Sequence, residues 1–361
     1  MFDLSNLMEP KLRIAIVANA NSIHTIRWVD ELKNRGHIVK VFSLNAHDTA
    51  GYFGPEPPLD RRYLLTLGNN VRKTTIFLQN MINDFKPNLV HGFFLTNHGM
   101  YASKIKKIPT IVTAMGSDVL LAPNESRLLS WIVKNVVKRA DKIVAVSEAL
   151  SKNIVSWGIN SSKIIVSPLG IDCNLFKPLN KENSVVFSRG FKEVYDPLTL
   201  VKAIPYVISK IPNIKFILCG DGPLREECVS YLNEKEMMHS VEFPGYVSNE
   251  RLSAITGNAS VMVSPSLSDG TPVSLLEGLA SGCALVTSDI PANRFWTIKN
   301  KTGLMFDKGN SKHLGEVLVD VLNDNHLLKN VLKEGPKLVR EKADWDSEIS
   351  KIEKIYYNMI K

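Results

Sequence analysis

Cysteine is scarce in this chain of 361 residues, and its pattern is not that of a metal or disulfide protein. The four cysteines are Cys173, Cys219, Cys228 and Cys283, and no two of them form a C-x-x-C pair. A C-x-x-C spacing would be typical of a zinc or redox site. Cysteines without such a partner are expected to stay reduced in the cytoplasm. The sequence therefore indicates neither zinc nor disulfides, and we expect no bound metal ion.

Long apolar runs are missing as well. None approaches the roughly 18 residues that would span a bilayer, and the N-terminus MFDLSNLMEPKLRIAIVANA has no basic segment ahead of an apolar core. Low-complexity tracts are also lacking, and 44% hydrophobic with 22% charged residues is the composition of a globular protein. We therefore expect a cytoplasmic protein. It is long enough for two domains, since single cores rarely grow past about 250 to 300 residues.

The chain has no excess of negative charge, since its net charge is +8. All of the excess positive charge lies in the first half. Residues 1–174 carry 21 Lys plus Arg against 13 Asp plus Glu, whereas residues 175–361 carry 23 of each. Several of these cations are interleaved with apolar residues in one segment: Arg127, Lys134, Lys138, Arg139 and Lys142. Such a helix can lie on an anionic membrane surface, bind an acidic ligand, or be the solvated face of a domain. No nucleic-acid motif accompanies the charge, so we expect no nucleic-acid partner.

What the chain does contain is an alternation of short β-prone runs with helical patterns. The runs lie at 12–18, 38–44, 89–94, 110–113, 143–147 and 164–167, and then at 185–188, 214–219, 241–243, 260–264, 284–287 and 304–306. This alternation predicts an α/β protein with two Rossmann-like, doubly wound domains that face one another across a cleft. We place the domains at residues 1–176 and 177–340, with a linker at 178–183. A final helical segment, 341–361, is expected to pack back on the first domain.

The most informative stretch is SPSLSDGTPVSLLEGLASG at 264–282. A β-prone run ends where this polar segment begins, and the apolar spacing that follows predicts a helix from about Pro272. The first N–H groups of a helix have no internal partner and carry the positive end of its dipole. They can hold a phosphate over the small residues Gly270, Thr271 and Ser274.

Two acidic residues, Asp269 and Glu277, lie on either side of this phosphate cradle. A carboxylate accepts hydrogen bonds well from the hydroxyls of a sugar, so the pattern indicates a nucleotide-sugar rather than a free nucleotide. The alternative is an ordinary strand-loop-helix with a capping aspartate.

Several ordered motifs carry a resemblance to a known family. In the second half they read VFSRG at 186–190, FILCGDGPL at 216–224, FPGYVSNERL at 243–252, SPSLSDGTPVSLLEGLASGCALVTSD at 264–289 and TGLMF at 302–306. This half resembles the family 4 glycosyltransferases, which have the GT-B fold. The first half is similar to the same family through NSIHTIRWVDELKNRGHIVKVFSL at 21–44, AMGSDVLL at 114–121, AVSEAL at 145–150 and SPLGID at 167–172. The resemblance covers nearly the whole chain.

The resemblance implies a donor site in the second domain. Arg189 would bind the donor diphosphate, since its planar, permanently charged group neutralises charge that grows on the leaving group. Where many relatives carry a lysine this chain has Tyr195, and Lys192 is the candidate substitute. The family's E-x7-E pair corresponds to Asp269, which would contact the transferred sugar, and Glu277, which would contact the ribose. The residues implied around the sugar and phosphate are Gly270, Thr271, Val273 and Ser274.

The first domain would then carry the acceptor side. Many relatives have a histidine before the GSD-like turn, where this chain has Met115, so Asp118 becomes a better catalytic candidate. The other acceptor-side candidates follow the first strand: Asn19, Asn21, Ser22, His24, Thr25 and Arg27. His24 is as readily a capping or packing histidine as a catalytic one. We expect His91 and His98 to be structural.

Two familiar signatures carry no function here. The segment GDGPLR at 220–225 lacks the third glycine of a dinucleotide motif, so a dehydrogenase is not expected. The segment DWD at 344–346 matches a metal-binding D-x-D only in its letters, because it lies in a late helical region.

As a whole, the resemblance implies a retaining glycosyltransferase that uses a UDP- or GDP-sugar and a glycan or lipid-linked acceptor. Its product would be a polysaccharide, glycolipid or other glycoconjugate, and it would need no cofactor besides the donor. The basic first domain is consistent with a peripheral position at the inner face of an anionic membrane. Two alternatives remain open: a non-catalytic GT-B protein that binds nucleotide-sugar or glycan, and a sugar-nucleotide epimerase.

Overall fold

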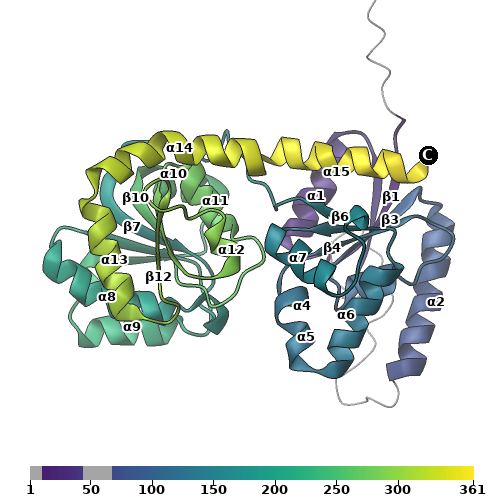
Figure 1. Cartoon of the computed structure of the whole chain (residues 1–361), viewed down its shortest axis with the longest axis horizontal. Helices are drawn as coiled ribbons and strands as arrows, with labels where there is room; N and C mark the ends of the chain where they lie inside the picture. The colour runs from purple at the N-terminus through teal and green to yellow at the C-terminus, as the bar shows by residue number, and fades with distance from the viewer. Residues whose placement is uncertain (1–9, 44–66) are drawn as a thin grey trace, which may run out of the picture. The chain divides into compact units, whose positions relative to one another are not determined.

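The computed structural model describes residues 10–43 and 67–361, and Figure 1 labels most of their helices and strands. By their contacts they form two compact units, Met1–Val166 with Ile352–Lys361, and Ser167–Lys351. The chain thus divides between Val166 and Ser167, earlier than the boundary after residue 176 that the sequence predicted. The segment that rejoins the first unit begins at Ile352 rather than at residue 341.

The first unit is built on a parallel sheet of six strands in the order β2-β1-β3-β4-β5-β6. The strands are β1 (Arg13–Val17), β2 (Ile38–Phe42), β3 (Leu89–Phe93), β4 (Thr110–Ala114), β5 (Lys142–Ala145) and β6 (Ile164–Val166). Strands β3 and β4 are buried at every position, which explains their nearly continuous apolar sequences. All six correspond to predicted runs; the last residue of the second run, Leu44, lies outside the described residues.

Helices connect these strands. They are α1 (Ile23–Asn34), α2 (Leu67–Phe85), α3 (His98–Ala102), α4 (Ser117–Leu120), α5 (Ala122–Glu125), α6 (Arg127–Arg139), α7 (Glu148–Ser156) and the 3-10 turn Ser161–Lys163. Helix α6 holds most of the predicted basic amphipathic segment. Its start is capped by Ser126, whose Oγ accepts a bond from Leu129 N at 3.1 Å, and its inner face buries Val133, Val136 and Val137.

The second unit repeats the plan, with the strand order β12-β11-β10-β7-β8-β9. The strands are β7 (Glu182–Ser188), β8 (Lys215–Cys219), β9 (Val241–Gly245), β10 (Ala259–Ser264), β11 (Ala284–Ser288) and β12 (Gly303–Phe306). The helices are α8 (Pro197–Lys210), α9 (Arg225–Glu234), α10 (Asn249–Asn258), α11 (Val273–Ala280), α12 (Pro291–Arg294), α13 (Ser311–Asn323), α14 (Asn325–Ala343) and α15 (Trp345–Ile360), with 3-10 turns at Glu193–Tyr195 and Met238–Ser240. Two doubly wound parallel sheets confirm the predicted α/β class.

The predicted linker at 178–183 is wrong, because this segment is anchored in the second unit. Strand β7 already begins at Glu182. Before it, Lys181 Nζ donates to the carbonyl oxygens of Ala259 at 2.6 Å and Ser281 at 2.7 Å. A lysine that caps carbonyls inside a domain looks like an ordinary polar linker residue in the sequence.

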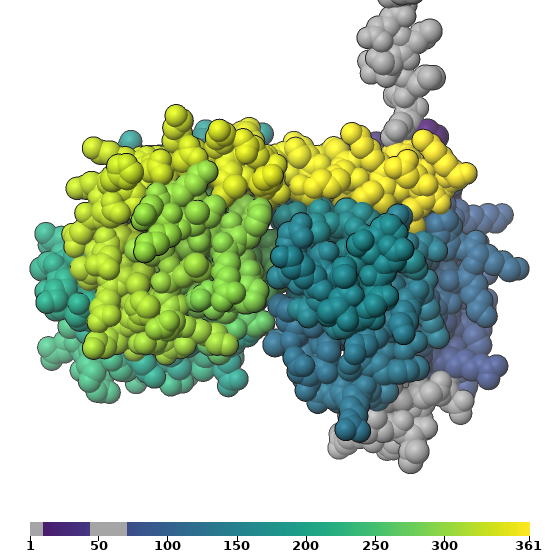
Figure 2. Space-filling model, in the orientation of Figure 1, coloured from purple at the N-terminus to yellow at the C-terminus, as the bar shows by residue number. Residues whose placement is uncertain are grey.

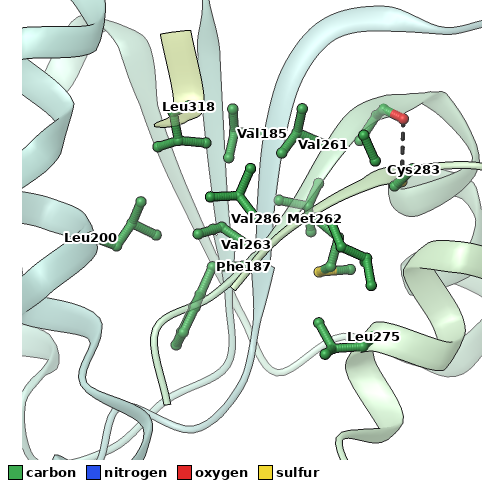
Figure 3. Packing of buried hydrophobic residues seen from close by; sticks show 14 of the residues in the cluster. Val185, Phe187, Leu200, Val261, Met262, Val263, Leu275, Cys283, Val286 and Leu318 are labelled. Atoms are coloured by element: carbon green, nitrogen blue, oxygen red, sulfur yellow. Dashed lines mark hydrogen bonds between the residues drawn. The ribbon is translucent and has the colours of Figure 1, made fainter. Parts of the chain in front are cut away.

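The core of the second unit lies on both faces of its sheet. Figure 3 shows Leu200 from α8 and Leu275 from α11 on opposite sides of the strand residues Val185 and Val261. Figure 2 shows the atoms at the surface of each unit on the same face of the molecule as Figure 1. All four cysteines are buried as free thiols, and Cys283 Sγ donates to the carbonyl oxygens of its neighbours.

Candidate functional site

Strands β7 and β10 lie side by side and parallel, so their carboxyl ends meet at one edge of the second sheet. Arg189 follows β7 directly, and the segment 265–272 leads from β10 into α11. Helix α11 begins at Val273 with Pro272 at its N-cap, where the sequence predicted a helix start. The carboxyl edge of a doubly wound sheet is where such folds bind ligands.

Arg189 contacts both a carboxylate and an aromatic ring. Its Nη2 donates to Oδ2 of Asp269, and its guanidinium carbon lies 4.1 Å from the centroid of the Tyr195 ring. The two charged side chains are only 13% and 9% exposed. The sequence placed Arg189 and Asp269 in one site but not in one ion pair, because nothing in the order of residues shows that β7 and β10 are neighbours.

The second oxygen of Asp269 also has a partner, since Oδ1 accepts a bond from Gly270 N at 2.8 Å. Burial raises the pKa of Asp269, and the charge of Arg189 opposes that rise. Asp269 therefore fixes both the guanidinium and the loop before α11. Its predicted contact with a sugar stays a prediction.

Two buried polar atoms of this site have no hydrogen-bond partner among the described residues: Arg189 Nε and Ser274 Oγ. Ser274 lies in the first turn of α11 and is 2% exposed. Leaving a buried polar group unpaired costs about 1 to 3 kcal/mol, so each of these two atoms calls for a partner that a water molecule or a ligand can supply. Together with the N-terminus of α11, they are donors of the kind that bind an anion.

The remaining predicted donor-site residues lie around this centre. Gly270 and Thr271 are buried in the loop, and Val273 and Glu277 are half-buried on α11. Glu277 follows Ser274 by three residues, so the two share one face of the helix. Lys192 is exposed, and its Cε lies 3.9 Å from the place of a Cβ on Gly190, beside the Arg189 turn.

The acceptor-side candidates of the first unit gather where β1 leads into α1. Ser22 is the N-cap of α1, so His24 is not the capping residue, and Asn19 accepts a bond from Asn21 N at 3.1 Å. Asn21 is exposed, whereas Ser22, His24 and Arg27 are half-buried. Thr25 is 1% exposed and lies on the inner face of α1 with Trp28, which leaves little of it to contact a substrate.

Asp118 is not available for catalysis, and this prediction is corrected. It is 1% exposed, and its carboxylate accepts bonds from the backbone N–H groups of Leu95 at 2.8 Å, Gly116 at 2.8 Å and Met115 at 3.1 Å. Burial raises the pKa of Asp118, and these bonds oppose the rise. The side chain ties the loop after β3 to the loop after β4.

His91 is structural, as expected. It is fully buried, with Nδ1 2.6 Å from the hydroxyl of Tyr356 and Nε2 2.6 Å from Thr113 Oγ1. Burial lowers the pKa of His91 to about 3 and that of His98 to about 4. Within the part of the chain that the structure describes, no cluster of three or more His, Cys, Asp or Glu could hold a metal ion.

The sequence reasoning missed the contribution of the turn at 220–222. A Cβ on Gly220 would lie 2.4 Å from the carbonyl oxygen of Arg189, and one on Gly222 would lie 2.6 Å from that of Phe191. Phe191 N also donates to the carbonyl oxygen of Asp221 at 2.9 Å. The sequence shows that residues 220–222 are Gly-Asp-Gly, but it does not show which backbone atoms these glycines approach.

Comparison with known proteins agrees with this geometry. Residues 13–147 match the family model described as glycosyl transferase 4-like, and residues 175–338 match the model of glycosyl transferases group 1. The two matches together span most of the chain. The protein belongs to the GT4-like glycosyltransferases, and it is therefore a transferase.

Individual relatives are distant in sequence. The chain is 24% identical over 286 residues to an uncharacterised glycosyltransferase of Methanocaldococcus jannaschii, with 77% of each protein covered. It is also 24% identical to the N,N'-diacetylbacillosaminyl-diphospho-undecaprenol alpha-1,3-N-acetylgalactosaminyltransferase of Campylobacter jejuni, over 71% of this chain and 72% of the relative.

Solved structures show the fold. Sucrose-phosphate synthase of Thermosynechococcus elongatus is similar with a TM-score of 0.78 and 16% identity, over 97% of this chain and 99% of that one. HepE of Anabaena in complex with UDP-glucose is similar with a TM-score of 0.77 and 15% identity, over 96% of this chain and 100% of that one. The chain has the GT-B fold of these enzymes.

Proposed function

We propose that this glycosyltransferase moves a sugar from a UDP- or GDP-sugar to an acceptor hydroxyl with retention of configuration. The observation that carries the proposal is the pair of buried, unpartnered atoms, Arg189 Nε and Ser274 Oγ, at one edge of the second sheet. Oxygens of a diphosphate would bond to both. The structure of Anabaena HepE with UDP-glucose supports this class of donor, because its fold is similar over nearly the whole chain.

In the proposed reaction, the bond between the anomeric carbon and the diphosphate oxygen breaks, and both electrons leave with the phosphate. The acceptor oxygen bonds to the same face of the sugar, and the leaving phosphate oxygen takes the acceptor's proton. No protein nucleophile is needed. Arg189 and the N-terminus of α11 stabilise the charge that grows on the diphosphate. Lys192, exposed beside the Arg189 turn, adds a second positive charge at the edge of this site. Glu277 would accept hydrogen bonds from the ribose hydroxyls, and Asp269 would contact the sugar through its remaining lone pairs.

The acceptor that we propose is a glycan or a lipid-linked sugar, in the biosynthesis of a polysaccharide or glycolipid. The Campylobacter jejuni relative supports this class, since its name describes a sugar linked to diphospho-undecaprenol. Across the described residues, none of the helices has the length and apolar character needed to cross a bilayer. We propose that the enzyme works in the cytoplasm, at the inner face of the membrane.

The test is the release of UDP or GDP from a panel of nucleotide-sugars, with and without acceptors, alongside calorimetric binding of UDP and GDP. Ser274→Ala should weaken binding of the preferred nucleotide by about tenfold or more, since a bond to a charged group contributes roughly 1.5 to 3 kcal/mol. The matched control is Ser230→Ala, an exposed serine on α9. Equal affinities of the two variants would sink the site assignment. Binding without turnover would favour a non-catalytic protein, and an altered sugar-nucleotide without acceptor would favour an epimerase.

A further inference from the structure

Two cavities adjoin one another in the first unit, between α2, α3 and α6. The larger has a volume of about 850 Å³ and the smaller about 90 Å³, and both are lined by Ser103, Lys104 and Arg139. Lys104 precedes β4 and Arg139 precedes β5, so these residues lie toward the amino ends of the strands. The acceptor-side candidates after β1 lie at the opposite, carboxyl edge of the same sheet. The cavities are therefore outside the site described above.

The walls of these cavities are basic. Arg72, Lys104, Lys106 and Arg139 line them, and the described lining residues include no aspartate or glutamate. None of the four cations forms an ion pair with a described residue. Burial, together with the nearby charge of Arg139, lowers the pKa of Lys104. Cations held together in this way repel one another, and an anion between them would relieve that repulsion.

Large apolar side chains are exposed beside the same cavities. Ile76 lines the larger cavity and is 52% exposed, and Trp131 lines the smaller one and is 61% exposed. Leu128, one turn before Trp131 on α6, is 48% exposed. The residues 128, 131, 132, 135 and 139 follow helical spacing, so they form one outward stripe of α6 that ends at Arg139. Exposed apolar side chains that adjoin one another beside a cluster of cations are typical of an interaction surface.

We propose that this basic-apolar surface, made by Arg72, Ile76, Lys104, Leu128, Trp131 and Arg139, docks the enzyme on an anionic membrane. Trp131, Leu128 and Ile76 enter the headgroup region, where an indole is favoured, and Lys104 and Arg139 bind the phosphate of an anionic lipid. A soluble acidic glycan would account for the cations but not for the exposed apolar side chains. The inference rests on the proposed membrane location and gives it a particular surface.

The experiment is flotation of the full-length protein with vesicles of phosphatidylcholine, alone or mixed with phosphatidylglycerol. We expect binding to the mixed vesicles only, weakened by added salt. The pair Lys104→Gln and Arg139→Gln should bind about tenfold more weakly or worse, because each cation near an anionic surface strengthens binding several-fold. The pair Leu128→Ser and Trp131→Ser should lose binding to a similar degree while keeping the charge.

The matched control is the pair Lys308→Gln and Lys329→Gln, at two exposed lysines of the second unit. These substitutions remove the same amount of charge. A control that loses as much binding as the Lys104 pair would show that net charge alone is responsible, and would overturn the proposal. So would wild-type protein that ignores anionic vesicles, or that binds a soluble polyanion in their place. Circular dichroism verifies that each variant is folded. UDP binding, measured on the same samples, tests the donor site separately, so the two proposals can fail independently.

Discussion

Tyr195 occupies the position at which the family resemblance implied a lysine, and in the structure its side chain contacts Arg189. Its ring packs against the Arg189 guanidinium, whose carbon lies 4.1 Å from the ring centroid. Such a contact contributes about 0.5 to 2 kcal/mol, depending on how far it is desolvated. A lysine would add a second cation to the site. The ring instead restricts the orientation of Arg189, which also forms an ion pair with Asp269.

We therefore predict that Tyr195→Phe binds UDP as wild type does, because the ring remains. Tyr195→Leu should bind UDP about three- to tenfold more weakly, since it loses the cation–π contact. The measurement is calorimetric titration with UDP or whichever nucleotide the donor panel identifies. A leucine variant that binds as well as the phenylalanine variant would show that the ring does not position Arg189.

His91 makes the stability of the first unit depend on pH. The folded pKa is about 3, below the unfolded value of about 6.5, so between these values the unfolded chain binds the extra proton. The free energy of unfolding should therefore fall as the pH is lowered from about 6.5 toward 3, by up to about 1.4 kcal/mol per pH unit. His98 acts in the same direction, with a folded pKa of about 4.

His91→Gln keeps hydrogen-bonding groups but cannot titrate. We expect its unfolding free energy, measured by urea denaturation between about pH 4 and 6.5, to depend less steeply on pH than that of wild type. The variant can be less stable overall, but the slope is the diagnostic quantity. His326→Gln, at an exposed histidine in the second unit, is the control that should keep the wild-type slope.

At the scale of elements, the glycine turn between β8 and α9 supports the donor site. Gly222 has a φ of +153°, and its Cα approaches the carbonyl oxygen of Phe191 so closely that a Cβ would lie 2.6 Å from it. Leu224 N donates to that same oxygen at 3.0 Å. The turn therefore holds the segment that follows Arg189.

Gly222→Ala should displace this segment. We predict a loss of stability of about 2 kcal/mol or more, because backbone strain alone costs roughly 1 to 3 kcal/mol and the clash adds to it. UDP binding should weaken as well, since Arg189 moves with its neighbours. Gly309→Ala is the control: its φ is +76°, but no atom lies within 4 Å of the added Cβ. Thermal unfolding of both variants measures the loss of stability from backbone strain. Nucleotide titration of both variants measures the effect of displacing the segment after Arg189.

The sequence predicted the regular elements well, and the reason lies in their burial. The parallel strands of both sheets read as short β-prone runs between helical patterns, so their positions followed from the sequence alone. The start of α11 also followed, from Pro272 and the spacing after it. By contrast, the family resemblance made Asp118 a catalytic candidate, and the sequence does not show the three N–H groups that its carboxylate binds. Contacts between distant segments carry no local signal.

At the scale of the whole molecule, the first unit is discontinuous, because its last residues come from the end of α15. Ile352 and Tyr356 are fully buried, and the Tyr356 hydroxyl lies 2.6 Å from His91 Nδ1. Glu353 accepts a bond from Arg35 Nη1 at 3.0 Å and lies 2.7 Å from His37 Nε2. The stability of the first unit therefore depends on a segment that follows the whole second unit in sequence.

A chain that ends at Lys351 should lose the fold of its first unit. Burying a large apolar side chain stabilises by about 1.5 to 3 kcal/mol, so losing Ile352, Tyr356 and Tyr357 removes several kcal/mol from a total of roughly 5 to 15. The loss of Tyr356 also leaves His91 Nδ1 buried without its partner. We expect hydrogen exchange to show β1, β3 and β4 unprotected, while the strands of the second unit keep their protection. A chain that ends at Tyr357 retains these contacts and should remain protected throughout; equal protection in both chains would mean that the sheet of the first unit is stable without α15.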